Sequence, residues 1–125
     1  MDALLDTVFE PAEKLYRAVH PKSMYWKDDG SVSSAAFFSK KGHCSVDRGN
    51  YRDDAEVIQD MRNRNFKGKF VSVTVQICYD IDANVVYAPS KGNIYHSEIH
   101  GDKEQRKLTP KQRRHLAKHA TVLNT

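Results

Sequence analysis

The stretch from Phe70 to Ile77 constrains the fold of this 125-residue chain more than any other segment. Apolar and polar side chains alternate along it, as Val71, Ser72, Val73, Thr74, Val75, Gln76 and Ile77. Because successive side chains of a strand point to opposite faces, this alternation predicts a strand with one buried face. The chain must therefore build a sheet with a core on at least one side.

Length and composition predict one globular domain spanning residues 1–125. Hydrophobic residues make up 39% of the chain and charged residues 29%, which is typical of folded rather than disordered proteins. The apolar runs are too short for a membrane span, and the first twenty residues lack the pattern of a secretory signal. We expect a cytoplasmic protein in which Cys44 and Cys78 are free thiols, with one disulfide as the alternative.

Helices are predicted near the beginning, the middle and the end of the chain. Apolar residues at helical spacing mark the first, which Pro11 divides, and Asn50 is the candidate N-cap of the second. Thr109 and Pro110 open the last helix, which is basic and has Leu123 at the end of its apolar stripe. The three helical segments are residues 2–19, 50–65 and about 109–123.

Short apolar or alternating runs predict the remaining strands. They are Val32–Phe38, His43–Val46, Asn84–Ala88 and Asn93–His100. The connections between the later strands are too short for parallel crossovers. The predicted fold class is therefore α+β, a mainly antiparallel sheet with N-terminal, central and C-terminal helices.

The net charge of +4 is unevenly distributed along the sequence. Residues 103–119 contain seven lysines and arginines, Arg113 and Arg114 among them, against the single acid Glu104. Such a segment suits an anionic partner. A solvated helix face without a partner is the alternative interpretation.

The segment Asn93–His100 concentrates the residues that could carry chemistry. In a strand His96, Glu98 and His100 share one face, and two imidazoles beside a carboxylate form an acid/base set. Alternate residues of a strand lie roughly 7 Å apart, which strains convergence on one metal ion. We therefore expect neither a metal nor a cofactor here, and a polar solvated edge strand is the alternative.

Further residues could hold a phosphate. Arg48 ends the run Ser45-Val46-Asp47-Arg48 and offers the planar donor fork that suits phosphate, although a solvated turn is equally consistent with it. Arg17 and His20 are three residues apart, so they face the same way if the first helix persists. Ser33 and Ser34 could approach a ligand closely or form cross-strand hydrogen bonds.

Four blocks together resemble a group of small bacterial and phage-type hypothetical proteins. They are Leu15–Pro21, Val32–Phe37, Ser45–Arg48 and Tyr95–His100. The resemblance covers most of residues 15–120 and implies that the blocks belong to one module. It assigns no catalytic role to any residue.

A fainter similarity is to ADP-ribosyltransferase-like domains. In those domains an early-strand arginine or histidine, a strand with small hydroxyl residues and a later glutamate surround NAD. Arg17, then Ser33 or Ser34, then Glu98 follow that order here. The departure from the family is that Arg17 falls in a predicted helix.

The leading functional hypothesis is binding of a phosphorylated ligand, either RNA or a nucleotide, with metal-independent acid–base phosphodiester chemistry. His96 and His100 serve as acid and base, and Glu98 orients an imidazole. Arg48, with Arg17 or His20, holds the phosphate, and the basic last helix steers the substrate. A non-catalytic binding or protein-interaction module is the first alternative, and an NAD-dependent enzyme is the second.

Overall fold

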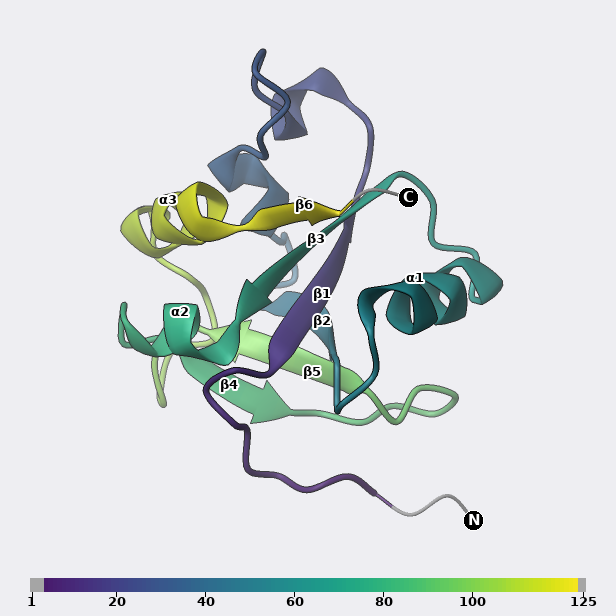
Figure 1. Ribbon diagram of the computed structural model, residues 1–125. Coiled ribbons are helices and arrows are strands. Elements are labelled where there is room, and N and C mark those ends of the chain that lie inside the picture. Colours follow the sequence, from purple (N-terminus) through teal and green to yellow (C-terminus); the bar gives the residue numbers. More distant parts are fainter. Residues whose placement is uncertain (1–3, 124–125) are drawn as a thin grey trace.

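The computed structural model describes residues 4–123, and its centre is a six-stranded antiparallel sheet (Figure 1). The strands lie in the order β4-β5-β2-β1-β3-β6. Their bounds are β1 Lys14–Val19, β2 Cys44–Arg48, β3 Lys69–Thr74, β4 Asn84–Tyr87, β5 His96–His100 and β6 Thr121–Leu123. The α+β class and the antiparallel sheet are therefore confirmed.

The larger part of the core lies on one face of the sheet. Leu15, Val46 and Ile99 point to this side and pack against α2, α3 and the turns η1 and η2. These elements span Val75–Tyr79, Pro110–His119, Ser23–Tyr25 and Ser34–Phe37 respectively. Burial of these apolar side chains is the main force that holds the layers together.

A helix covers only one half of the opposite face of the sheet. Helix α1, Asp54–Asn63, packs Val57, Ile58 and Met61 against Tyr16 and against Phe70 and Leu123. Figure 1 shows α1 on the other side of β1 from α2 and α3. The half of this face formed by β2, β5 and β4 has no helix among the described residues and carries polar side chains.

The predicted helix over residues 2–19 is wrong. Residues 14–19 form β1, which pairs with β2 on one side and β3 on the other, and residues 4–13 contain no helix. Leu4 and Val8, which gave the helical spacing, are exposed. A central strand gains two hydrogen-bonded neighbours that local spacing cannot anticipate. Residues 2 and 3 lie outside the described part.

The caps of the other two predicted helices fix where they begin. Asp53, not Asn50, caps α1, accepting a hydrogen bond from the Glu56 backbone at 2.8 Å. Asn50 instead has a φ of 48° in the turn before the helix. Thr109 caps α3 as predicted, but the helix ends at His119, and Leu123 belongs to β6. The predicted extent of 109–123 is therefore four residues too long at its end.

Several predicted strands are shorter than expected, and of the runs Asn93–His100 and Asn84–Ala88 only His96–His100 and Asn84–Tyr87 are strand. The alternating run from Phe70 stays extended only to Thr74, whose hydroxyl accepts a hydrogen bond from the Ile77 backbone and caps α2. In the run from Val32, one bridge forms between Val32 and Trp26 before η2 begins at Ser34. The side-chain cap thus overrides the strand preference of the valines.

Candidate functional site

Strands β2 and β5 carry matched polar pairs on the face that α1 leaves open. Ser45 lies opposite Glu98, and Asp47 lies opposite His96. Along β5 the intervening residues Ser97 and Ile99 are buried on the core side. The predicted placement of His96, Glu98 and His100 on one face is therefore confirmed.

Glu98 is the centre of a cluster of basic groups, here called the Glu98 cluster, which comprises Glu98, His43, His100 and Arg106. One carboxylate oxygen lies 2.7 Å from His100 Nε2 and 3.4 Å from a guanidinium nitrogen of Arg106. The other lies 3.6 Å from His43 Nε2. Arg106 also donates to His43 Nδ1 at 2.8 Å, so the ring proton of a neutral His43 lies on Nε2, facing Glu98.

The surroundings of the cluster set its protonation. Burial opposes the charge of Glu98, yet the hydrogen bond from His100 and the charges of His43 and His100 outweigh it and lower the Glu98 pKa. Burial lowers the pKa of His43, and Arg106 and the other imidazoles lower it further against the pull of Glu98. The cluster therefore favours an ionised carboxylate and a neutral His43 near neutral pH.

A hollow of about 290 Å³, here called the β2 hollow, adjoins the cluster. Ser45, Asp47, His96 and Arg17 line it on the sheet side, and Phe66 lies at its rim after α1. Its further lining residues are Tyr16, Ala18, Val46, Met61 and Asn93. The volume is at the lower limit of small-ligand sites, enough for part of a nucleotide.

Hydrogen bonds fix the polar groups of the β2 hollow. His96 Nδ1 lies 2.8 Å from the Ala88 carbonyl, which can only accept, so Nδ1 carries the proton and Nε2 of the neutral ring is an acceptor. Asp47 is buried and accepts from Asn93 at 3.0 Å and from Arg64. His96 is thus available for hydrogen bonding, whereas Asp47 is already paired.

Arg17 lies where β1 and β2 separate. The two strands pair at Leu15–Arg48 and Tyr16–Asp47, and beyond that point the Arg17 guanidinium bridges the gap. Its Nε donates to the Ala36 carbonyl and its Nη1 to the Ser45 carbonyl, each at 2.7 Å. Arg17 is therefore a strand residue that ties β1, β2 and η2 together beside the β2 hollow.

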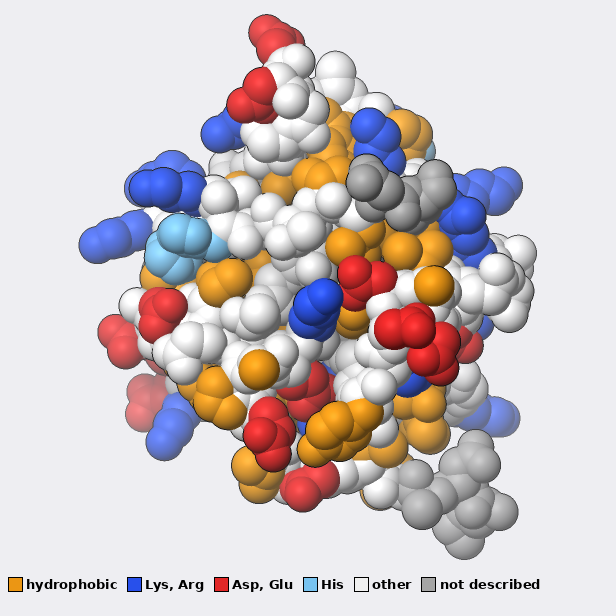
Figure 2. Space-filling view, in the orientation of Figure 1, with side chains coloured by type: hydrophobic (Ala, Val, Ile, Leu, Met, Phe, Trp, Pro, Cys, Tyr) orange, Lys and Arg blue, Asp and Glu red, His pale blue; other side chains and the backbone are white. Residues whose placement is uncertain are grey.

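Another hollow, of about 430 Å³, lies on the acidic side of the molecule. Figure 2 shows acidic side chains gathered on that face, near α1 and the N-terminal segment. Glu13, Lys14, Tyr16 and Asp54 are among its lining residues. Their polar atoms are paired internally, since the Tyr16 hydroxyl donates to Asp54 at 2.5 Å and Lys14 lies 3.2 Å from the same oxygen.

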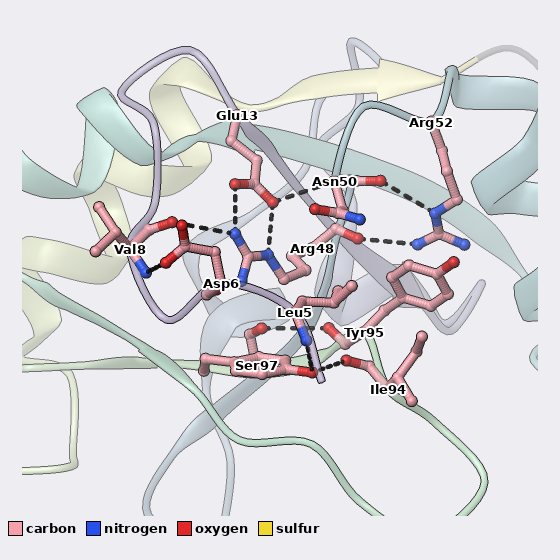
Figure 3. A network of polar contacts seen from close by, with 12 residues as sticks. Leu5, Asp6, Val8, Glu13, Arg48, Asn50, Arg52, Ile94, Tyr95 and Ser97 are labelled. Atoms are coloured by element: carbon pink, nitrogen blue, oxygen red, sulfur yellow. Dashed lines mark hydrogen bonds and ion pairs between the residues drawn. The ribbon is translucent and has the colours of Figure 1, made fainter. Parts of the chain in front are cut away.

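Arg48 does not join the site. Its side chain is 2% exposed, and its Nε and Nη2 each lie 2.8 Å from an oxygen of Glu13 (Figure 3). It also donates to the carbonyls of Asp6 and Val8 and lies over the Phe9 ring, 4.0 Å from the centroid. Because its donors are used inside the fold, Arg48 is a structural residue here and is not available to an external phosphate.

The other residues predicted to bind a ligand fall into separate places. Arg17 and His20 line a second hollow of about 190 Å³, the β1 hollow, whose other lining residues are Ala18, Val19, Tyr25, Ala36 and Phe38. Ser34 and Arg113 line a third of about 520 Å³, the η2 hollow, with Met24, Tyr25, Ala35, Phe38 and Lys40. Ser33 donates its hydroxyl proton to the Met24 carbonyl at 2.7 Å, and Arg114 is exposed elsewhere on α3.

Two members of the Glu98 cluster were absent from the predicted site. His43 could have been found, because period-two spacing in a strand over His43–Val46 places it on the face of Ser45. Arg106 could not, because it lies in a loop without regular spacing. Long-range packing alone brings Arg106 to His43, 63 residues away in the sequence.

Neither a metal-binding cluster nor a membrane-spanning helix is found in residues 4–123. The resemblances stated above remain predictions. The chain matches no family model, no curated protein and no solved structure.

Proposed function

We propose that this chain binds a phosphorylated ligand, RNA or a nucleotide, on the open face of β2 and β5, and cleaves phosphodiesters by metal-independent acid–base chemistry. The observation that carries the proposal is the contact of one ionised carboxylate, Glu98, with two imidazoles and a guanidinium. Histidines are gathered there on the sheet face that α1 leaves open, and their side chains remain 14–17% exposed. A cytoplasmic location is part of the proposal, supported by the free thiols of Cys44 and Cys78.

Geometry favours His43 and His100, rather than His96 and His100, as the acid–base pair. His96 and His100 are four residues apart on one strand, roughly 13 Å at Cα, which is too far to serve one phosphate readily. His43 and His100 instead contact opposite oxygens of the same carboxylate. His96 then contacts the ligand in the β2 hollow.

The proposed step balances its protons between these two imidazoles. As the exposed Arg106 guanidinium turns from His43 Nδ1 to the phosphate, that nitrogen of neutral His43 accepts the proton of a ribose 2′-hydroxyl, whose oxygen attacks phosphorus. His100, in its protonated form, donates a proton to the departing 5′-oxygen. The products are a 2′,3′-cyclic phosphate and a free 5′-hydroxyl. Arg106 stabilises the negative charge on the phosphoryl oxygens in the role predicted for Arg48, and Glu98 orients both rings.

The test is cleavage of mixed RNA in the presence of EDTA by the wild type and by single variants. We expect His43→Ala and His100→Ala each to reduce the rate by about 10²–10⁴-fold, the usual contribution of a general acid or base. His119→Ala, at an exposed histidine on α3, is the matched control and should cleave normally. Cleavage that is absent in the wild type, or equal in all variants, would falsify the proposal and leave the non-catalytic binding module.

A second candidate is an NAD-dependent enzyme, and one observation favours it. Arg17 lies on strand β1 rather than in a helix, as the ADP-ribosyltransferase-like resemblance requires. Ser45 on β2 takes the place expected for Ser33 or Ser34, and it lies directly opposite Glu98. This candidate predicts nicotinamide release from NAD that is lost in Glu98→Gln and Arg17→Lys but retained in His43→Ala, whereas the RNA-cleaving candidate predicts no release.

A further inference from the structure

The β2, β1 and η2 hollows are joined through shared residues. Arg17 and Ala18 line both the β2 hollow and the β1 hollow. Tyr25 and Phe38 line both the β1 hollow and the η2 hollow. The hollows therefore follow one another from Ser45, opposite Glu98, past the Arg17 side chain to the surface between η2 and α3, and this series is here called the path.

The charges along this path have one sign. The β1 hollow is lined by Arg17 and His20, and the η2 hollow by Lys40 and Arg113, with no carboxylate among the described residues that line either one. The acid of the β2 hollow, Asp47, is paired with Arg64. The path therefore complements an extended anion rather than a compact neutral ligand.

Phe38 stands where the β1 and η2 hollows meet. The chain leaves η2 in an extended conformation at this residue, so Phe37 is buried in the core while Phe38 is 43% exposed. The Arg113 guanidinium lies 5.2 Å and the Lys107 ammonium 6.0 Å from the centre of the Phe38 ring. An accessible aromatic ring flanked by cations is the arrangement on which unpaired bases stack while their phosphates are neutralised.

We infer that the three hollows form one track for a single strand of nucleic acid, with a base stacked on Phe38 and a phosphodiester presented to the Glu98 cluster. This inference extends the proposed function and rests on it for the identity of the cleaved bond. The track also predicts different roles for two neighbouring arginines of α3, because Arg113 lines the track and Arg114 does not.

The binding test uses a fluorescein-labelled ten-nucleotide strand of polythymidylate DNA, which lacks the 2′-hydroxyl and so is not cleaved by the proposed chemistry. Anisotropy titration should give a Kd for the decamer at least tenfold lower than the Kd of thymidine monophosphate. The second value comes from competition of thymidine monophosphate with the labelled decamer. Phe38→Ala should weaken decamer binding about tenfold, in line with one lost base stack. Phe38→Tyr should retain the affinity, and Phe38→Leu, which keeps apolar volume, should not.

Two matched controls separate the track from a general positive field. Tyr79→Ala removes an aromatic ring that is also 43% exposed but lies on α2, and it should bind normally. Arg113→Gln and Arg114→Gln remove the same charge from the same helix, and the track predicts the larger loss for Arg113. Equal losses for the two arginines with no effect of Phe38→Ala would overturn the track in favour of non-specific steering.

The outcomes also separate this inference from the proposed function. If the wild type cleaves RNA but binds the decamer no more tightly than thymidine monophosphate, the track is overturned and the proposed function is not. Decamer binding with the expected variant pattern but without any RNA cleavage supports the track and overturns the catalytic proposal. Unfolding curves for each variant show whether a loss of binding reflects a loss of fold.

Discussion

Two carboxylates of this protein, Glu13 and Glu98, are similarly buried, with side chains 9% and 13% exposed, but their basic partners differ in what they can do. Glu13 meets Arg48, a permanently charged group that is 2% exposed and also satisfied by backbone carbonyls. Glu98 meets two histidines, which can gain and lose protons, and Arg106, which is 57% exposed. The first cluster has no donor to spare for a ligand, whereas the second can change its charge and exchange partners.

The comparison shows that residue type alone does not separate a structural ion pair from a site. Arginine beside a carboxylate was the predicted anchor for phosphate, and it proved to be the most buried charged group. What distinguishes the Glu98 cluster is its position on the half of the sheet face that α1 does not cover. The predictions below test this contrast, starting with the largest expected effect.

The largest effect is expected from Arg48→Ala. Removing the guanidinium leaves the Glu13 carboxylate buried without its partner, which typically costs about 3–5 kcal/mol of unfolding free energy. Urea unfolding followed by circular dichroism measures the loss. Arg48→Met in combination with Glu13→Gln should recover part of it, because no buried charge then lacks a partner. An Arg48→Ala protein of normal stability that no longer binds nucleotide would reverse our interpretation of the two clusters.

Glu98→Gln should show the opposite profile. The amide keeps the shape of the side chain but cannot hold the imidazoles electrostatically, so we expect RNA cleavage to fall by about a hundredfold. The stability change should be smaller than that of Arg48→Ala, about 1–2 kcal/mol, because the amide is neutral and the charge of Arg106, whose side chain is 57% exposed, remains solvated. Single-turnover kinetics and urea unfolding on the same sample provide the two values. A loss of stability comparable to that of Arg48→Ala would show that the Glu98 cluster is structural.

The Glu98 cluster should also make stability depend on pH. The pKa of His43 is lowered below its ordinary value of 6.5, so the unfolded chain binds the proton first and stability falls as pH drops below that value. The lowered pKa of Glu98 adds a second loss as pH falls below the ordinary 4.5 toward the folded value. Urea midpoints between pH 7 and pH 4 should therefore decrease in the wild type and decrease less in His43→Gln. A midpoint that rises on acidification would contradict both assignments.

The smallest effect is expected at a third carboxylate, Asp54, which shows what an exposed pair contributes. Lys14 and Asp54 form an ion pair in which the two side chains are 49% and 40% exposed. Lys14→Ala should change the unfolding free energy by less than about 0.5 kcal/mol. Tyr16→Phe should cost more, about 1 kcal/mol, because it removes a partly buried hydroxyl bonded to the same oxygen. Equal effects of the two substitutions would mean that exposure is not what distinguishes these contacts.

Local signals in the sequence explain which elements could be predicted. The cap at Thr109 and the alternation from Phe70 onward depend on neighbouring residues alone, so α3 and the start of β3 were predictable. Strand β1 was not, because helical spacing in residues 4–12 outweighed a strand whose two partners lie far along the chain. The structural role of Arg48 could not be predicted for the same reason, because its contacts are with residues 35 or more positions away in the sequence.

The candidate site divides in the same way. Strand periodicity was enough to place His96, Glu98 and His100 on one face, and it could also have included His43. The same spacing places His96 roughly 13 Å from His100, so the sequence could also have shown that they are too far apart to share a phosphate. Arg106 depends on how a loop packs, which no pattern in its own neighbourhood indicates.

The position of Arg48 has a consequence for how far the chain can be trimmed from its start. Residues 4–13 form no helix or strand, and such a segment would ordinarily be judged dispensable. Yet the carbonyls of Asp6 and Val8, the ring of Phe9 and the carboxylate of Glu13 all contact one guanidinium. A protease that cut after Phe9 would detach two of these acceptors and the ring, leaving a buried cation without most of its neighbours. This irregular segment is therefore part of the folded unit.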